Sequence, residues 1–257
     1  MQYKVGTKAL ATVTPGSEVP SPPRTVPPPD RRTAATMLLL TFEGIDGSGK
    51  STQARRLRDR LRTAGYETLL VREPGGTDFS ERVRSLLLDS SLNVQPFAEL
   101  LLFSAARAQL VAERIRPALE DGCIVICDRF YDSTTAYQGA GRGVAEPEWL
   151  QPFHRRVTDD LVPDRTYLVE VDVETARRRR DDDGGEADRM EAAGSAFYER
   201  VSAAYAELAE AHPDRIVRLD GHRSIDDLEA EIWADVRSLM AADGGTANSG
   251  TGSSTPQ

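Results

Sequence analysis

A glycine-rich segment at residues 44–51 has the residue types and spacing of a loop that binds phosphate groups. Its sequence, GIDGSGKS, fits the pattern G-x-x-x-x-G-K-[ST], and its lysine is one of only three in the chain. Backbone N–H groups of such a loop surround phosphate oxygens, and a lysine is a compact charge that can follow a transferring phosphate, whereas an arginine is a planar fork. We predict a nucleoside-triphosphate site formed by Gly44, Ile45, Asp46, Gly47, Ser48, Gly49, Lys50, Ser51 and Thr52.

A second segment predicts a bound magnesium ion. The apolar run CIVIC at residues 123–127 ends in Asp128, as in nucleotide-binding proteins whose carboxylate faces Mg²⁺. The hydroxyl of Ser51 is the other ligand expected in such sites, so we assign the metal to Ser51 and Asp128. Arg129 follows directly and is suited to hold the phosphate of an acceptor.

Three further residues point to a second ligand beside the triphosphate. Arg72 ends an apolar run and precedes the turn PGG, so it falls where open α/β sheets bind ligands. Phe103 and Arg107 are four residues apart and share one helical face. A ring followed by a guanidinium one turn later is suited to stack on a base and to hydrogen-bond its edge, although an aromatic residue at such a position more often belongs to the core.

Apolar runs that alternate with amphipathic patterns predict how these residues are positioned. The expected strands are 38–43, 67–72, 123–127, 166–171 and 215–219. The expected helices are 50–64, 78–88, 96–120, 147–158, 173–180, 190–211 and 225–240. This alternation favours an α/β fold with a parallel sheet covered by helices on both faces. It places the glycine-rich loop between the first strand and the first helix, as phosphate binding requires.

Composition limits the organisation and the partners of the chain. The 257 residues carry a formal net charge of −9, which argues against a nucleic-acid partner. No apolar stretch reaches the roughly 20 residues of a membrane span. Proline-rich residues 1–36 and glycine- and serine-rich residues 242–257 are expected to be disordered and to flank a single domain at 37–241. Cys123 and Cys127 would be roughly 13 Å apart on one strand, too far for a disulfide, so we expect reduced thiols in the cytoplasm.

The order of five segments is similar to that of a known family. The segments are FEGIDGSGKST, VREPGGT, LLFSAARAQLV, ICDRFYDSTTAYQGAGRG and ADRMEAAG. Over about residues 38–240 the chain resembles thymidylate kinases, which are P-loop nucleoside monophosphate kinases. The resemblance implies a P-loop NTPase fold with a five-stranded parallel sheet and a small lid. It also implies ATP-dependent phosphorylation of dTMP to dTDP with Mg²⁺, and a homodimer.

The resemblance also implies roles for individual residues. Phe103 would stack on thymine and Arg107 would bind the base edge, while Arg72 and Arg129 would hold the phosphate of dTMP. The remaining contacts with dTMP would come from Thr134, Tyr137 and Gln138. Catalytic roles would fall to Lys50, Arg129, Arg189 and Asp46. Glu199 aligns with an acidic residue that some members place near the same site.

The expected lid spans about residues 177–190 and differs between members of the family. Some members carry a basic residue at the variable loop positions, whereas this chain has Ile45, Asp46, Gly47 and Ser48 there. It carries a run of four arginines, Arg177 to Arg180, and then Arg189. The lid therefore resembles the form that supplies the catalytic cation, and Arg189 is the position expected to do so. The other interpretation of the run is a solvated helix end.

Three alternative functions remain open from the sequence. The first is a kinase for another nucleoside monophosphate, the second is a nucleotide-dependent switch, and the third is an inactive relative. A switch leaves Arg72, Phe103 and Arg107 without a role, and an inactive relative does not explain an intact Lys50 and Asp128. The choice of acceptor has to be measured.

Overall fold

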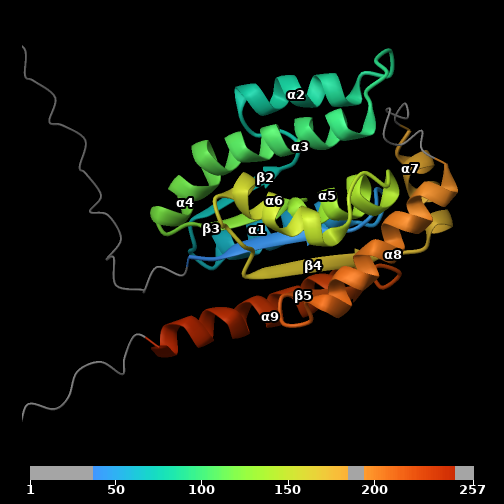
Figure 1. The fold of residues 1–257 in the computed structure, drawn as a ribbon. Helices are drawn as coiled ribbons and strands as arrows, with labels where there is room; N and C mark the ends of the chain where they lie inside the picture. Colours follow the sequence, from blue (N-terminus) through green and yellow to red (C-terminus); the bar gives the residue numbers. More distant parts are fainter. Residues whose placement is uncertain (1–36, 185–193, 247–257) are drawn as a thin grey trace, which may run out of the picture. The chain divides into compact units, whose positions relative to one another are not determined.

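The computed structural model describes residues 37–184 and 194–246, which form a sheet with helices on both faces (Figure 1). The strands are β1 (Leu39–Glu43), β2 (Thr68–Arg72), β3 (Ile124–Asp128), β4 (Arg165–Glu170) and β5 (Ile216–Asp220). Their order across the sheet is β2-β3-β1-β4-β5, and every neighbouring pair is parallel. The predicted α/β fold and its five strands are confirmed.

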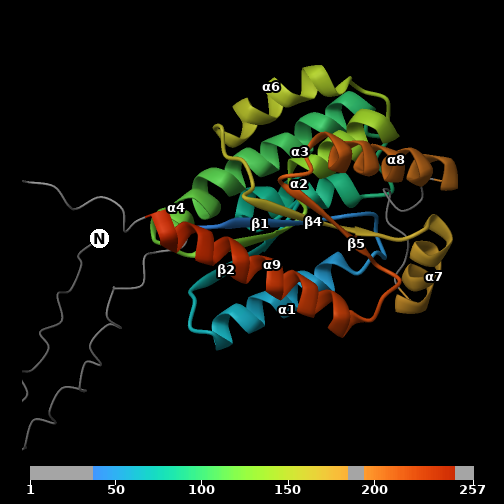
Figure 2. The ribbon, with the colours of Figure 1, turned by 90° about the horizontal axis from the view of Figure 1, so that it is seen from below.

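Helices connect the strands and cover the sheet in two layers. They are α1 (Lys50–Thr63), α2 (Asp78–Leu88), α3 (Pro96–Leu110), α4 (Arg116–Glu120), α5 (Tyr131–Thr134), α6 (Pro147–Thr158), α7 (Val173–Asp183), α8 (Ser195–Ala211) and α9 (Ile225–Thr246). Helices α1 and α9 lie side by side on one face, and α3, α6 and α8 lie on the other (Figure 2). None of the helices among the described residues has the length and apolar character needed to span a bilayer.

The central strand β1 shows why the sheet needs both layers. Leu40 and Phe42 are fully buried in a cluster with residues of α1 and α9. Leu39, which points to the opposite face, is buried in a second cluster with residues of β3 and of the segment that follows α3. A strand with apolar side chains on both faces is stable only when both faces are covered, as parallel sheets usually are.

The carboxyl edge of the sheet collects the residues predicted to do chemistry. In the register of the sheet, Asp128 pairs with Phe42 on one side and with Arg72 on the other. Glu43 follows Phe42, and the glycine-rich loop begins at the next residue. This register brings Arg72, Asp128 and the loop to one edge, although long stretches of sequence separate them.

Two helical segments differ from the sequence prediction. The predicted helix at 96–120 contains a π-helical turn, Val111–Ile115, between α3 and α4. Pro117 has no N–H to donate to the carbonyl four residues earlier, which favours a local change of hydrogen-bond pattern. Residues 131–141 are not among the expected helices, but they form α5 and a π-helical segment, Thr135–Gly141.

Tertiary packing explains this missed segment. Glycines and hydroxyl residues have low helix propensity, so the local sequence gives no helical signal. A Cβ atom at Gly141 would lie 2.6 Å from the ring of Phe197, so the glycine allows α8 to pack closely against the segment. The helical segment was missed because its packing against α8 outweighs the low helix propensity of its residues.

Several predicted boundaries fall at or beyond the limits of the described residues. The extension at 1–36 lies outside them, as do lid residues 185–190 with Arg189. Helix α7 extends three residues past the predicted end at 180. Helix α9 ends at Thr246, inside the predicted tail at 242–257, whose last eleven residues are not described.

Candidate active site

A cavity of about 240 Å³ opens at the carboxyl edge of the sheet. It brings together eleven of the predicted residues, namely Asp46, Lys50, Ser51, Arg72, Phe103, Arg107, Asp128, Arg129, Thr134, Tyr137 and Gln138. It is also lined by residues that sequence analysis did not single out, namely Glu73, Pro74, Arg84, Leu88 and Ser133. Glu199 lies exposed on α8 and is not among the residues that line this cavity.

The glycine-rich loop has the backbone conformation that its sequence predicts. Gly44, Gly47 and Gly49 have φ values of 137°, 86° and 102°, which residues with a Cβ atom rarely adopt. Helix α1 begins at Lys50 without a side chain capping its first N–H groups. The positive end of the helix therefore faces the loop, as in sites that bind phosphate.

Asp46 forms ion pairs with two of the cationic residues that line the cavity, Lys50 and Arg129. Its Oδ1 lies 2.6 Å from Nη2 of Arg129 and 3.3 Å from Nζ of Lys50, and Tyr137 donates a hydrogen bond to its Oδ2 over 3.0 Å. Desolvation alone would raise the pKa of Asp46, but the charges of Arg129 and Lys50 outweigh it and hold that pKa well below its usual value. The carboxylate is therefore ionised and pairs with both cations at neutral pH.

Arg129 and Arg72 are placed to hold an anion. Arg129 has a positive φ of 76°, and its Nη atoms donate hydrogen bonds to Ser133, Tyr137 and Asp46. Its Nε–H makes no hydrogen bond to a residue that the structure describes. Arg72 is exposed and makes neither a hydrogen bond nor an ion pair with the described residues, so its guanidinium is available to a ligand.

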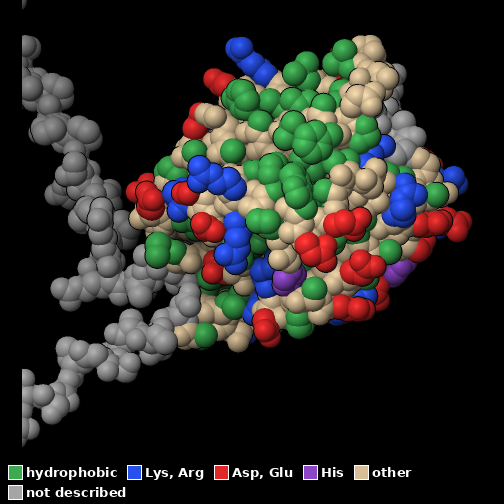
Figure 3. All heavy atoms as spheres, in the orientation of Figure 1, with side chains coloured by type: hydrophobic (Ala, Val, Ile, Leu, Met, Phe, Trp, Pro, Cys, Tyr) green, Lys and Arg blue, Asp and Glu red, His purple; other side chains and the backbone are tan. Residues whose placement is uncertain are grey.

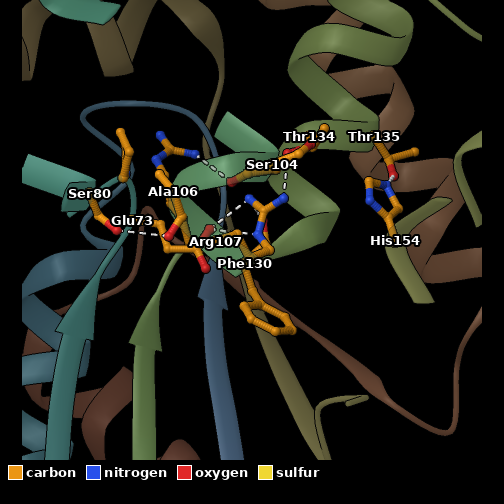
Figure 4. Close-up of polar contacts among 12 residues, drawn as sticks. Glu73, Ser80, Ser104, Ala106, Arg107, Phe130, Thr134, Thr135 and His154 are labelled. Carbon is orange, nitrogen blue, oxygen red and sulfur yellow. Dashed lines mark hydrogen bonds and ion pairs between the residues drawn. The ribbon is translucent and has the colours of Figure 1, made fainter. Parts of the chain in front are cut away.

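Arg107 is held rigidly at the other end of the cavity. Its guanidinium is 2% exposed and donates hydrogen bonds to Glu73 over 2.7 Å, to Thr134 over 2.9 Å and to the carbonyl of Phe130 over 3.1 Å (Figure 4). Figure 4 also shows Thr135, next in the chain to Thr134, turned toward His154 in α6, with a separation of 3.0 Å between its Oγ1 and Nε2. Phe103 lies half-buried on α3, one turn before Arg107, and lines the same cavity.

Glu43 supports the turn that carries Arg129, and the sequence analysis missed it. Its Oε1 accepts hydrogen bonds from the N–H groups of Phe130 and Ser133, and its Oε2 accepts them from the hydroxyls of Ser133 and Tyr205. Desolvation, followed by the charge of Asp132, raises the pKa of Glu43 to about 7. A charged residue inside an otherwise apolar strand was the signal that would have identified it.

Two arginines of α7 contact the phosphate-binding loop. Arg179 donates to the carbonyl of Ser48 over 3.3 Å, and Arg180 donates to the carbonyl of Asp46 over 2.6 Å. Arg177 and Arg178 are exposed on the same helix. The run is therefore not a uniformly solvated helix end, and only part of it faces the loop.

Gly47 is one of the variable loop positions, and the structure leaves no room for a side chain there. A Cβ atom at this position would lie 2.3 Å from the carbonyl oxygen of Ala176 in α7. Helix α7 thus occupies the space that a side chain at Gly47 would need, and it brings Arg179 and Arg180 to the loop instead.

Comparisons with known proteins agree with this geometry. The family model described as thymidylate kinase matches residues 42–232. This chain belongs to the thymidylate kinase family. The curated thymidylate kinase of Deinococcus radiodurans is 47% identical over 203 residues, which cover 77% of this chain and 96% of that protein. The curated thymidylate kinase of Thermomicrobium roseum is 46% identical over 201 residues, covering 78% of this chain and 95% of that protein.

A solved structure extends the likeness from sequence to fold. The crystal structure of thymidylate kinase from Ehrlichia chaffeensis is 34% identical, with a TM-score of 0.63, and the match covers 78% of this chain and 98% of that one. The resemblance that the sequence indicated is therefore confirmed. The P-loop NTPase fold expected of a thymidylate kinase is confirmed with it.

The donor set of this thymidylate kinase suits a magnesium ion. Ser51 and Asp128 both present oxygen atoms to the cavity that Lys50 lines. No group of three or more metal-binding side chains occurs within residues 37–184 and 194–246. Mg²⁺ fits such a site because it usually binds one or two protein oxygens and completes its shell with phosphate oxygens and water.

The buried Glu43 predicts how stability changes with pH. Its pKa is about 7 in the folded chain against 4.5 ordinarily, so the folded state binds the proton more tightly than the unfolded state. This contribution to stability is fully present below about pH 4.5 and is lost as pH rises through about 7. Wild type should therefore lose free energy of unfolding relative to Glu43→Gln between about pH 5 and about pH 8. Urea unfolding at each pH tests this, and parallel profiles for the two proteins would contradict it.

Proposed function

We propose that this thymidylate kinase transfers the γ-phosphoryl group of ATP to dTMP within the cavity at the carboxyl edge of the sheet. One observation carries the proposal. The same cavity is lined by Lys50 and Ser51 of the phosphate-binding loop and by Phe103 and Arg107 of α3. A single compartment with both features suits a triphosphate donor and a nucleotide acceptor that meet end to end.

The chemistry of the acceptor determines what the site must supply. The second pKa of a phosphate monoester is about 6, so dTMP is mostly a dianion at neutral pH and needs no strong base to activate it. Catalysis then consists of bringing two anions into line and neutralising the charge between them. Lys50 is assigned to the transferring phosphate, and Arg72 and Arg129 to the phosphate of dTMP.

Magnesium would be held by Ser51 and Asp128 together with phosphate oxygens. When bound, the ion neutralises charge on the donor phosphates. Asp46 forms ion pairs with Lys50 and Arg129 and so keeps both side chains in place within the site. The backbone N–H groups of the residues from Gly44 to Thr52 would orient the triphosphate.

The remaining contacts are assigned to the nucleoside of dTMP. Phe103 would stack on the base, Arg107 would donate to its edge, and Thr134 and Gln138 would complete the polar contacts. The ring of Tyr137 lies 4.8 Å from the guanidinium carbon of Arg129. Its hydroxyl donates a hydrogen bond to Asp46. Tyr137 therefore has a fixed position in the lining of the cavity, where the deoxyribose would lie.

A coupled assay tests the function against its alternatives. The purified chain is given ATP and Mg²⁺ with dTMP, dUMP, dCMP or dGMP in turn, and nucleoside diphosphate formation is measured. We expect the highest kcat/KM with dTMP. Faster turnover of dCMP or dGMP would support a different monophosphate kinase, and slow ATP hydrolysis that no acceptor stimulates would support a nucleotide switch.

The lid is assigned a catalytic cation in addition to Lys50, because the variable loop positions 45–48 carry no basic residue. Arg189, which lies outside the described residues, is the position expected to supply it. An arginine that reaches the transferring phosphoryl group is worth about 10³–10⁵ in kcat. Arg179, Arg180 and Arg189 are each changed to alanine in separate variants. In at least one of these variants kcat should fall by about 10²-fold or more, with little effect on dTMP affinity. Arg177→Ala and Arg178→Ala are matched controls, because these side chains are exposed, and they should stay within about threefold. If all five variants keep kcat within about threefold of wild type, the lid does not supply the cation.

A homodimer is proposed from the apolar surface over α2, α3 and α6. Figure 3 shows hydrophobic side chains gathered on this face. Five large exposed apolar residues lie on these three helices, each between 45% and 51% exposed, namely Phe79, Leu86, Phe97, Leu101 and Trp149. Such a continuous patch on a soluble chain usually marks a contact with another protein.

The oligomeric state tests this surface directly. Sedimentation velocity should show a dimer for wild type and a monomer for Leu101→Glu, because a buried carboxylate would oppose association. Ile225→Glu is the control, since Ile225 is similarly exposed (50%) but lies at the start of α9, on the opposite layer. A wild-type monomer, or an unchanged dimer in Leu101→Glu, would contradict the assignment.

The two free cysteines, Cys123 and Cys127, are in keeping with a cytoplasmic location, which we propose for this activity.

A further inference from the structure

Glu99 on α3 is a buried carboxylate that the proposed mechanism does not use. It is 1% exposed and lies one turn before Phe103. Its Oε1 accepts a hydrogen bond from Nε2 of Gln138 over 2.9 Å and another from Nε of Arg142 over 3.2 Å. Gln138 lines the cavity, whereas Glu99 and Arg142 do not, so Glu99 lies behind Gln138 as seen from the cavity.

This contact determines which atom of the Gln138 amide faces the ligand. An ionised carboxylate has only acceptor atoms, so the amide must turn its NH₂ group toward Glu99. Arg142 forms an ion pair with the same carboxylate over 3.2 Å. The amide oxygen of Gln138 accepts no hydrogen bond from a residue in the described ranges, and it is the group left to face the cavity.

A donor lies at the same end of the cavity. Arg107 donates to Thr134 through one N–H of its Nη1, and a guanidinium Nη atom carries two. The ion pair with Glu73 fixes the orientation of this guanidinium. The cavity thus offers a donor from Arg107, whose guanidinium can only donate, and an acceptor from Gln138, whose amide is oriented by its hydrogen bond to Glu99.

We propose that Glu99 is a positioning residue for base selectivity, because it fixes the Gln138 amide with its oxygen toward the base. A base that presents a carbonyl oxygen beside a ring N–H, as thymine and uracil do, matches the pair formed by Arg107 and Gln138. Cytosine presents an amino group beside a ring nitrogen that carries no hydrogen. Its amino group would face an N–H of Arg107, and its ring nitrogen would face the amide oxygen of Gln138, so neither contact is a hydrogen bond. The inference rests on the proposed function, since it requires Gln138 to face the base of the acceptor.

The chemistry of glutamine makes Glu99 more than a packing residue. The amide of Gln138 could rotate by half a turn and present its NH₂ group to the ring nitrogen of cytosine, if nothing held it. A glutamine at position 99 can donate as well as accept, so it pairs with either orientation of Gln138. Removing the charge at Glu99 therefore releases the amide without removing Gln138 itself.

The test compares acceptor selectivity in wild type and Glu99→Gln. The measured quantity is the ratio of kcat/KM for dTMP to that for dCMP, with ATP saturating. This ratio should fall by about tenfold or more in Glu99→Gln, because a wrongly paired base no longer meets a fixed acceptor. The ratio for dTMP to dUMP should stay within about twofold, since both bases present the same carbonyl and N–H. The KM for ATP should not change.

Two controls separate this effect from a general disturbance. Glu113→Gln makes the same chemical change at an exposed residue of the helical stretch that continues α3, where Glu113 also accepts from a glutamine, Gln109. It should leave both selectivity ratios unchanged. In a Gln138→Leu background, Glu99→Gln should change the selectivity no further, because the effect requires the amide of Gln138.

The outcomes distinguish this inference from the proposed function. If wild type does not phosphorylate dTMP, the proposed function fails. Two results would overturn the role of Glu99 in an enzyme that prefers dTMP. In the first, Glu99→Gln leaves the ratio of kcat/KM for dTMP to that for dCMP unchanged. In the second, Glu99→Gln changes this ratio by the same factor with and without Gln138→Leu. Should Glu99→Gln melt below the assay temperature, Glu99→Met, which is similar in length and uncharged, replaces it with the same expected fall in the ratio.

Discussion

Repulsion between two phosphate groups is the constraint on which this site depends. Donor and acceptor anions must approach each other closely, and cations must be in place before they do, because moving charges into position during the reaction would raise the barrier. In this structure two cations that line the cavity, Lys50 and Arg129, form ion pairs with one carboxylate, Asp46. The register of the sheet brings their elements together, since β1 leads into the loop with Lys50 and β3 leads into Arg129.

Buried glutamates support several of the groups that line the cavity. Glu73 holds Arg107, Glu99 holds Gln138, and Glu43 holds the turn that carries Arg129. In each case the carboxylate fixes the orientation of a donor or an amide that would otherwise rotate. Burial of three acidic side chains is costly unless each is paired or hydrogen-bonded, and every one of them is. The cost is offset by a site whose polar atoms are in place before the substrates bind.

The sequence predicts the residues that line the cavity better than the residues that support them. Lys50, Asp128 and Phe103 lie in motifs with characteristic spacing, and the strands that position them are short apolar runs bounded by turns. Glu99 has no such signal, because its role depends on a contact with Gln138, thirty-nine positions away, that only the fold creates. The helical segment at residues 131–141 was missed for the same reason, since its stability comes from packing against α8. The contacts of Arg179 and Arg180 with the loop likewise follow from the way α7 packs on Gly47.

The turnover of Asp46→Asn tests most directly whether a shared carboxylate sets the positions of Lys50 and Arg129. Asparagine keeps the size and the hydrogen bond to Tyr137, but it removes the charge that holds both cations. The account predicts that kcat falls by about 10²-fold or more, equivalent to about 2.7 kcal/mol in the barrier, while the protein stays folded with a similar melting temperature. A folded Asp46→Asn variant whose kcat stays within about threefold of wild type would contradict it.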